Sequence, residues 1–541
     1  MRYALIALAA CSSGLPAARY ANTPIVVTMD DRHDVPTTPE TRDFLPNLYF
    51  FDQSLHSPVD HALALERPRH AMGVNALDEV PDSTWFQNRN AQTRLTAEQV
   101  GTGPVTHDPG ANLPWTIESS KTGGSTRGFI VKDNSGVKYL LKFDALGDPP
   151  ELETATHVIC NRLMWAAGWN VAEDQILYVK RTDLVIGKDA KKKNLDGKTL
   201  GHLTEKDVDD VMKGVRAEKD GRLRVLASRW IDGTTVGGFP STGTRDDDPN
   251  DTIPHEHRRD LRGMATVDAW LDAVDVTEGQ FVDAWVEDHG HHYLRHYAVD
   301  FGKSMGAMGI IDHDWWRGHA YRVDIPDILH HTILLGLDDR WWEHRSGPAD
   351  LVGVSPLFDA TSFDPAHWYP DTPGFLSFRI ADRFDQFWGA ELVGSFTRDQ
   401  LRAAVDAGKL TDPRSVTYLV DTLEKRQRMV LAHWFAQVPP IVKPAYEQDL
   451  LCFDDLAIER QLVSTTKYII EPFDFDGRPL AATAIRATSS HTCAVVPFAP
   501  WLGNYTIFRV TIDRPEYAGS VYIHAARSPA GAMRVIGLWR E

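Results

Sequence analysis

Two aspartates and a glutamine lie in a stretch whose residue types could transfer a phosphoryl group. Asp275 follows a predicted helix and falls in a predicted loop, Gln280 lies in the same loop, and Asp300 ends a predicted strand within Asp-Phe-Gly. A loop carboxylate can orient an acceptor hydroxyl, while a carboxylate and an amide can bind the magnesium that accompanies a nucleotide. The pattern therefore indicates Asp275 as a catalytic acid, with Asp300 and Gln280 as metal ligands.

The segment that would bind phosphates lies upstream. Residues 115–144 have the alternation of three antiparallel strands separated by turns, and Lys142 lies near the end of the third strand. The first turn is rich in glycine and contains Lys121 and Gly124. Backbone amides and a lysine stabilise phosphate charge, so these residues are candidates for a nucleotide site. Taken alone, Lys142 also fits an ordinary lysine of an edge strand.

In this order, the Gly-rich turn, strand lysine, acidic helix start, loop aspartate and Asp-Phe-Gly resemble the protein-kinase-like superfamily, in particular its divergent bacterial branches. The resemblance implies ATP and Mg²⁺ as cofactors. It assigns Lys142 to the phosphates and gives it Glu151, or less well Glu153, as its ion-pair partner. It also implies an antiparallel N-lobe sheet with one helix and a helical C-lobe.

Two departures from the kinase pattern bear on activity. Gln280 stands where the pattern has Asn, and Ala273-Val274 replace the His-Arg that precedes the acid. The glycines of the first turn also lack the spacing of the kinase signature. These departures favour a degenerate, pseudokinase-like protein with a binding or scaffolding role. The alternative is an active ATP- and Mg²⁺-dependent phosphotransferase that acts on a protein or a small molecule.

Longer runs resemble a family of exported proteins from myxobacteria and related bacteria. The resemblance spans roughly residues 75 to 426 and supplies no function. The runs that carry it are Ala76-Leu-Asp-Glu-Val-Pro-Asp-Ser-Thr-Trp85, Tyr139-Leu-Leu-Lys-Phe-Asp144, Asp246-Asp-Asp-Pro-Asn-Asp251, Pro254-His-Glu-His-Arg-Arg259 and Arg295-His-Tyr-Ala-Val-Asp-Phe-Gly302.

The beginning of the chain has the features of a bacterial export signal. A basic start precedes a short apolar run, and Leu8-Ala9-Ala10-Cys11 resembles a lipobox, which implies cleavage before Cys11 and lipidation of its thiol. The run is too short to span a bilayer. We therefore expect an exported lipoprotein that is anchored to a bacterial envelope membrane through Cys11 and contacts a protein or glycan partner.

Composition agrees with a folded protein of several parts. The chain has 541 residues, with 43% hydrophobic and 24% charged residues, which is typical of globular proteins. Its net charge of -18 argues against nucleic acid as a partner, because phosphate backbones require a basic surface.

The predicted fold class is α+β. The predicted parts are a signal segment (1–10), a flexible tether (11–46), an N-terminal extension (47–114), a kinase-like N-lobe (115–235), a helical C-lobe (236–445) and a small all-β domain (446–541). The C-lobe contains a helix predicted over residues 254–271.

The cysteines divide into three groups. Beyond Cys11, Cys160 lies in a helical run and is expected to be buried, while Cys452 and Cys493 could form a disulfide in an exported protein. No cysteine spacing resembles a zinc site.

Overall fold

The computed structural model describes residues 15, 19–53, 69–123, 126–144, 149–194, 197–307, 316–337, 340, 342, 347–348, 350–496, 504–514 and 517–541. The chain divides into two compact units. The large unit comprises residues 28–73 and 80–434, and the small unit comprises residues up to 27, 74–79 and 435–541. Helices and sheets both contribute, so the predicted α+β class is confirmed.

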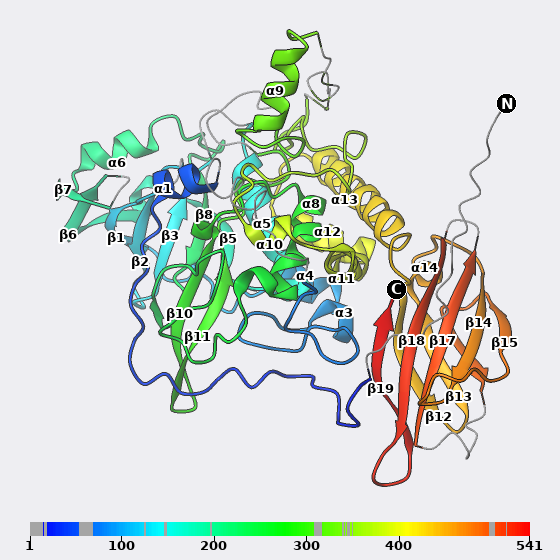
Figure 1. The fold of residues 1–541 in the computed structure, drawn as a ribbon. Helices are drawn as coiled ribbons and strands as arrows, with labels where there is room; N and C mark the ends of the chain where they lie inside the picture. Colours follow the sequence, from blue (N-terminus) through cyan, green and yellow to red (C-terminus); the bar gives the residue numbers. More distant parts are fainter. Residues whose placement is uncertain are drawn as a thin grey trace. The chain divides into compact units, whose positions relative to one another are not determined.

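A seven-stranded sheet forms one part of the large unit (Figure 1). Its order is β5-β8-β3-β2-β1-β6-β7, and neighbouring strands are antiparallel except for the parallel pair β1 and β6. The predicted three-stranded meander corresponds to the first three strands. The strands are β1 (Trp115–Ser120), β2 (Gly128–Lys132), β3 (Lys138–Lys142), β5 (Asp174–Val179), β6 (Leu184–Lys193), β7 (Thr199–His202) and β8 (Leu223–Arg229).

Alternation explains how this sheet forms its core. Trp115 and Ile117 lie on the same face of β1 and are fully buried, whereas Thr116 between them is exposed. Successive side chains of a strand point to opposite faces, so the apolar face packs inward. Helix α5 (Leu152–Ala167) contributes Val158 to a second cluster, with one apolar residue from each of β5 and β8.

Gly168 ends α5, as predicted from the sequence. Its φ of +147° is rarely adopted by residues with a side chain, and an added Cβ would lie 2.2 Å from the ring of Phe86. Conformation and space therefore both require glycine here.

A four-stranded sheet in the order β4-β11-β10-β9 carries the second half of the candidate site. Its strands are β4 (Asn170–Val171), β9 (Thr234–Thr235), β10 (Phe281–Asp288) and β11 (His291–Ala298). Phe281 is paired with Ala298, and the Val299 N–H donates to the Gln280 carbonyl at 2.9 Å. The hairpin therefore brings the loop before β10 next to the residues that follow β11.

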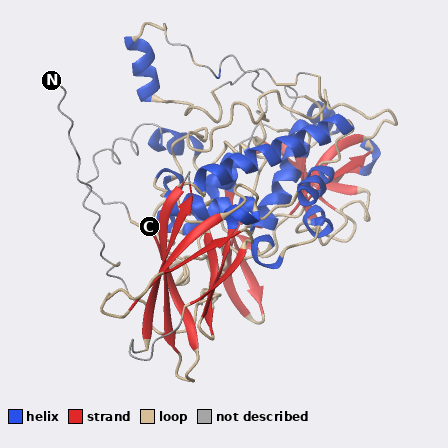
Figure 2. Cartoon of the chain, turned by 90° about the vertical axis from the view of Figure 1, so that its right-hand side faces the viewer, coloured by secondary structure: helices blue, strands red, loops and turns tan. Residues whose placement is uncertain are grey.

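Most of the remaining large unit is helical, and Figure 2 shows its main helices gathered as one group. Contacts connect α8 with α11 and α13, and α12 with α5 and α13. Besides α5, the helices are α1 (Pro46–Phe51), α3 (Asn90–Thr93), α4 (Ala97–Thr102), α6 (Glu205–Met212), α7 (Arg259–Arg262), α8 (Met264–Leu271), α9 (Ile325–Ile333), α10 (Leu376–Arg379), α11 (Arg383–Gly394), α12 (Arg398–Ala407) and α13 (Pro413–Trp434). Short 3₁₀ turns occur at η2 (Arg181–Asp183), η3 (His255–His257) and η4 (Glu278–Gln280).

The helix predicted over residues 254–271 differs from the structure. It is divided into η3, α7 and α8, because Arg258 has an extended backbone with ψ of 127° and Gly263 separates the last two helices. The apolar spacing predicted helical turns but not these interruptions.

Two sheets form the core of the small unit, and Figure 2 shows their strands in red. One has the order β12-β13-β16 and the other β15-β14-β17-β18-β19. Apolar residues from both sheets join a single buried cluster, so the sheets pack face to face. The elements are β12 (Ile441–Glu447), β13 (Leu450–Asp455), α14 (Leu456–Glu459), β14 (Thr466–Phe473), β15 (Thr483–Ala487), β16 (His491–Val495), β17 (Tyr505–Arg514), β18 (Tyr517–Arg527) and β19 (Met533–Arg540). The predicted boundary at residue 446 therefore falls inside β12.

The segment predicted as a flexible tether also differs from expectation. The Tyr20 hydroxyl donates to the Leu538 carbonyl within the small unit at 2.6 Å. In the large unit, the Arg42 N–H donates to the Val236 carbonyl at 2.9 Å, and the Arg42 side chain pairs with Glu278 at 2.6 Å. From residue 19 onward, these hydrogen bonds fix a segment whose composition has no apolar periodicity. Cys11 and the rest of the signal segment lie outside the described residues.

Candidate functional site

Lys142 and Asp300 meet between the two sheets of the large unit. Lys142 ends β3, Asp300 follows β11, and the lysine Nζ lies 2.5 Å from Asp300 Oδ1. The Lys142 side chain is only 6% exposed, whereas that of Asp300 is 42% exposed. The pair therefore has one buried member and one member that water can reach.

Each charge of this pair stabilises the other. Burial disfavours the Lys142 ammonium, but Asp300 and Glu153 outweigh that effect and raise the pKa of Lys142. Burial would likewise raise the pKa of Asp300, but the Lys142 charge outweighs it and holds this pKa well below its ordinary value of 3.8. At neutral pH the site contains an ammonium against a carboxylate.

The backbone at Asp300 is held in an uncommon conformation. Its φ of +61° lies in the left-handed region, which non-glycine residues rarely occupy and which concentrates at ligand-binding and active sites. On one side, His157 of α5 places Nδ1 3.8 Å from Asp300 Oδ1 while its Nε2 lies 2.9 Å from Asp174. The neighbouring Phe301 ring contacts the His157 ring edge to face at 6.0 Å. The helix α5 thus fixes the position of the Asp-Phe-Gly segment.

Lys121 adds a second cation to this group. Burial lowers the pKa of Lys121 to about 8, with a further contribution from the nearby charge of Lys142, against the opposing effect of Asp300. Its ammonium donates to the Gly123 carbonyl at 2.5 Å. The structure therefore brings together three of the predicted residues. Gly124, also predicted to bind the cofactor, lies outside the described residues.

Glu151 does not occupy the position predicted for it. It is the N-cap residue of α5 with a φ of +71°, and its carboxylate accepts hydrogen bonds from the Thr411 N–H at 2.9 Å and the Thr411 hydroxyl at 2.6 Å. The acid whose charge acts on Lys142 is Glu153, in the first turn of the helix. Glu151 therefore does not pair with Lys142; the carboxylate at hydrogen-bond distance from the lysine is that of Asp300, and Glu153 adds a further negative charge.

Asp275 lies in the loop after α8 and is held by two polar neighbours. Its Oδ2 lies 2.9 Å from Lys303 Nζ and accepts a hydrogen bond from the Gln280 amide at 3.2 Å. The oxygen of that amide accepts the Thr277 hydroxyl. Both ends of the Gln280 side chain are therefore used inside the loop.

A small cavity connects the two predicted acids. Asp275, Asp300 and Lys303 line it, together with the buried carboxyl of Asp268 on α8. Burial raises the pKa of Asp268 well above its ordinary value of 3.8. The other lining residues are Met164, Met264, Ala273, Val276, Gln280, Phe281, Ala298, Val299, Phe301 and Ser304.

No family model, curated protein or solved structure matches this chain. Within the part of the chain that the structure describes, no helix has both the length and the apolar character needed to span a bilayer.

The donors fit a hard divalent cation in part. Carboxylate oxygens are the ligands that Mg²⁺ prefers, and Asp275 and Asp300 line one cavity. The Gln280 side-chain oxygen accepts a hydrogen bond from the Thr277 hydroxyl. This hydrogen bond would have to break before the oxygen could bind a metal. The carboxylates of Asp275 and Asp300 thus suit the ion, whereas the Gln280 amide in its present hydrogen-bonded position does not.

Three residues of the site either were not predicted from the sequence or were predicted only as an alternative. Glu153 was the second choice for the lysine partner, and Lys303 and His157 were not singled out. Lys303 directly follows Asp-Phe-Gly, which is a usable signal for a cation near the acids. His157 lies one helical turn beyond Glu153, so it shares its face of α5.

Proposed function

We propose that the large unit has a kinase-like two-lobed arrangement that binds a nucleoside triphosphate with Mg²⁺. The contact between Lys142 and Asp300 carries this proposal, because a strand lysine and a carboxylate after a second strand are the pair that phosphotransferases direct at phosphate and metal. Lys142 and Lys121 would contact phosphate oxygens, and Asp300 would hold the metal. A bound metal ion would neutralise phosphate charge.

We further propose that this site is degenerate and serves binding or scaffolding. The loop glutamine supports this view, because the Gln280 oxygen is bonded to Thr277 and its nitrogen to Asp275. The Gln280 amide, which would be the second metal ligand, is therefore already hydrogen-bonded within its loop. The partner of such a pseudokinase would be a protein or a glycan.

A second candidate is an active phosphotransferase. Lys303 favours it, because its ammonium lies 2.9 Å from Asp275 and lines the same cavity. Asp275 would accept the proton of an acceptor hydroxyl, and the Lys303 ammonium beside it would help to position that carboxylate.

Thermal unfolding of the full-length protein with ATP and Mg²⁺ tests nucleotide binding. A ligand at 100 times its Kd stabilises the folded state by about 2.7 kcal/mol. The wild type should gain stability, and Lys142→Met and Asp300→Asn should lose that gain relative to their own ligand-free baselines. Lys206→Met and Asp246→Asn are matched controls, because both residues are exposed on the large unit. An absent shift in the wild type at millimolar ATP, or equal shifts in all variants, would refute the nucleotide site.

Transfer of label from γ-labelled ATP separates the two candidates. A degenerate site should bind without transfer, and Gln280→Asn should raise transfer if the extra methylene is what holds the amide away from the metal. Transfer by the wild type that is lost in Asp275→Asn would support the active enzyme instead.

We also propose export and membrane anchoring through a lipidated Cys11, from the resemblance of the first residues to a lipobox. Mass spectrometry of the mature N-terminus should find an acylated Cys11. An intact Met1 in protein taken from the producing cell would contradict export.

A further inference from the structure

Two cross-strand pairs place four polar side chains on one face of the small unit. In the β13–β16 ladder, Cys452 lies opposite Cys493 and Asp454 lies opposite His491. Residues two apart on a strand share a face. This face is the open one, since the intervening Leu451, Phe453, Thr492 and Ala494 are buried.

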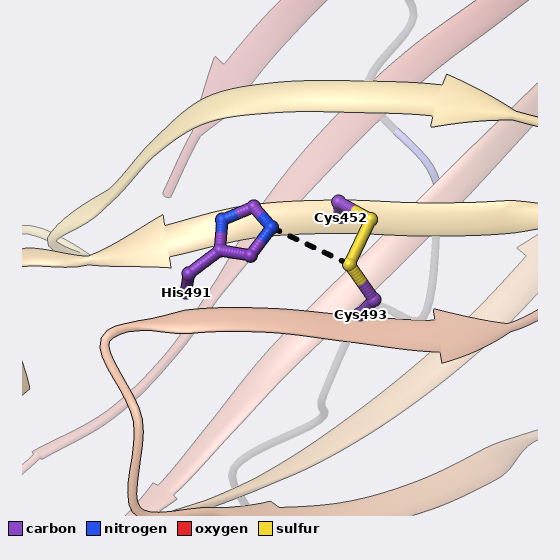
Figure 3. Close-up of side chains that lie close together, drawn as sticks. All are labelled: Cys452, His491 and Cys493. Carbon is purple, nitrogen blue, oxygen red and sulfur yellow. Dashed lines mark hydrogen bonds between the residues drawn. A yellow bond between two sulfur atoms is a disulfide. The ribbon is translucent and has the colours of Figure 1, made fainter.

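The sulfur atoms and one imidazole nitrogen lie together (Figure 3). Cys452 and Cys493 form a disulfide, and His491 Nε2 lies 3.6 Å from the Cys493 sulfur. The three donor atoms all lie within 4.8 Å of one another. Two sulfurs and one imidazole are a ligand set that zinc accepts, with water in the fourth position.

The second nitrogen of the imidazole is already oriented. His491 Nδ1 lies 2.7 Å from Asp454 Oδ1. A carboxylate only accepts hydrogen bonds, so Nδ1 carries a proton, and Nε2 is the ring nitrogen that faces the sulfurs. The carboxylate–histidine contact is the arrangement that orients histidines at zinc centres.

The separation of the nitrogen and the sulfur agrees with a tetrahedral zinc site. With Zn–S of about 2.3 Å and Zn–N of about 2.0–2.1 Å, a tetrahedral site separates nitrogen and sulfur by about 3.6 Å. The observed separation of His491 Nε2 and Cys493 Sγ is 3.6 Å. The two sulfurs would have to move apart to about 3.8 Å for the same geometry, which requires the disulfide to open.

We propose that the small unit contains a zinc site controlled by thiol–disulfide exchange, with Cys452, Cys493 and His491 as ligands and Asp454 as a positioning residue. A dithiol reductant exchanges with the Cys452–Cys493 bond, so that the reductant becomes the disulfide and the protein keeps two thiols. Zinc binding to the two thiols then converts them to thiolate ligands and releases their two protons. An added disulfide such as oxidised glutathione reverses the exchange, yields two glutathione thiols and expels the metal.

The pairing of β13 with β16 keeps the ligands together in both states. The ladder holds Cys452 opposite Cys493 through backbone hydrogen bonds that do not depend on the sulfur–sulfur bond. Their sequence separation of 41 residues also explains why no local spacing indicated zinc.

Cobalt titration of the full-length protein tests the site. After reduction by a phosphine and its removal under argon, Co²⁺ should give one equivalent of a thiolate charge-transfer band with the visible bands of tetrahedral cobalt. Zn²⁺ should displace the cobalt. The oxidised protein should give no such signal.

Variants separate this site from unspecific thiol binding. His491→Ala should abolish the tetrahedral spectrum, and Asp454→Asn should weaken zinc affinity about 10- to 100-fold. His289→Ala, at a histidine whose side chain is 96% exposed on the large unit, and the thiol variants Cys11→Ser and Cys160→Ser should bind as the wild type does. The proposal is wrong if reduced wild type gives no thiolate band, if His491→Ala binds equally well, or if circular dichroism shows that reduction unfolds the strands.

Discussion

Exchanging either member of the Lys142–Asp300 pair should destabilise the large unit, but by different amounts. Asp300→Asn leaves an ammonium that is only 6% exposed without its carboxylate, and loss of one partner of a buried pair costs about 3–5 kcal/mol. Lys142→Met leaves a carboxylate that is 42% exposed and that water can solvate. Screening by solvent reduces that loss to roughly 1 kcal/mol.

Urea unfolding, followed by tryptophan fluorescence and by amide exchange of β3 peptides, measures both losses. Lys138→Met is the matched control, because Lys138 lies on the same strand and pairs with Glu118 at 3.2 Å near the surface. It should change stability by less than about 1 kcal/mol. A larger loss for Lys142→Met than for Asp300→Asn, or a comparable loss for the control, would refute the reasoning from exposure.

The same pair fixes the expected pH dependence. The folded-state pKa of Asp300 is lowered, so its stabilisation is present above 3.8 and is lost as pH falls through the folded value. The pKa of Lys142 is raised, so its stabilisation is present below 10.5 and is lost as pH rises through the folded value. The stability difference between wild type and Lys142→Met should therefore stay level between about pH 4 and pH 7, because Lys121, whose pKa of about 8 Lys142 helps to lower, begins to titrate above that range. A slope between about pH 5 and pH 7 would contradict the assigned charges.

Three further outcomes are expected. Trp85→Ala should destabilise the large unit by about 3–5 kcal/mol in urea unfolding, because the buried indole stacks on His296 with ring centres 3.5 Å apart. The control Trp230→Ala, at a residue that is 41% exposed, should cost less than about 1 kcal/mol. Burial lowers the pKa of His524 to about 4, so the small unit should lose up to about 3 kcal/mol as pH falls from 6.5 to 4, as read from amide exchange of β18, and His524→Gln should flatten that profile. The raised pKa of Asp268 contributes a fall in stability as pH rises above 3.8, and Asp268→Asn should reduce that slope in urea midpoints measured between pH 4 and pH 8, where Asp371 and Asp385 also contribute.

The sequence correctly predicted strands in which buried and exposed side chains alternate. The first three strands alternate, and the residue types at Lys142 and Asp300 indicate a phosphate-and-metal chemistry. Their contact joins positions 158 residues apart and was not predicted, because the predicted ion-pair partner of Lys142 was Glu151 or, less well, Glu153.

Other features depend on backbone geometry that composition does not encode. Glu151 and Glu153 are two residues apart, but the positive φ at Glu151 turns its carboxylate toward Thr411. Lys303 reaches Asp275 because the chain after Gly302 returns to the loop that follows α8. The segment before residue 46 forms hydrogen bonds through single extended strands, which bury no repeating face and therefore leave no periodic signal.

The division of the chain between its two units has a consequence for how the protein can be made and cut. The small unit takes residues up to 27, residues 74–79 and residues 435–541, so the chain passes between the units four times. Tyr20 and Leu538 are hydrogen-bonded within it, although they lie 518 residues apart in the chain. The small unit can therefore close only after residues 435–541 have been synthesised, while residues 80–434 of the large unit are available to fold earlier. A fragment that starts at residue 435 would lack the earlier segments, and a protease cut between residues 27 and 74 would leave the pieces associated until denaturant separates them.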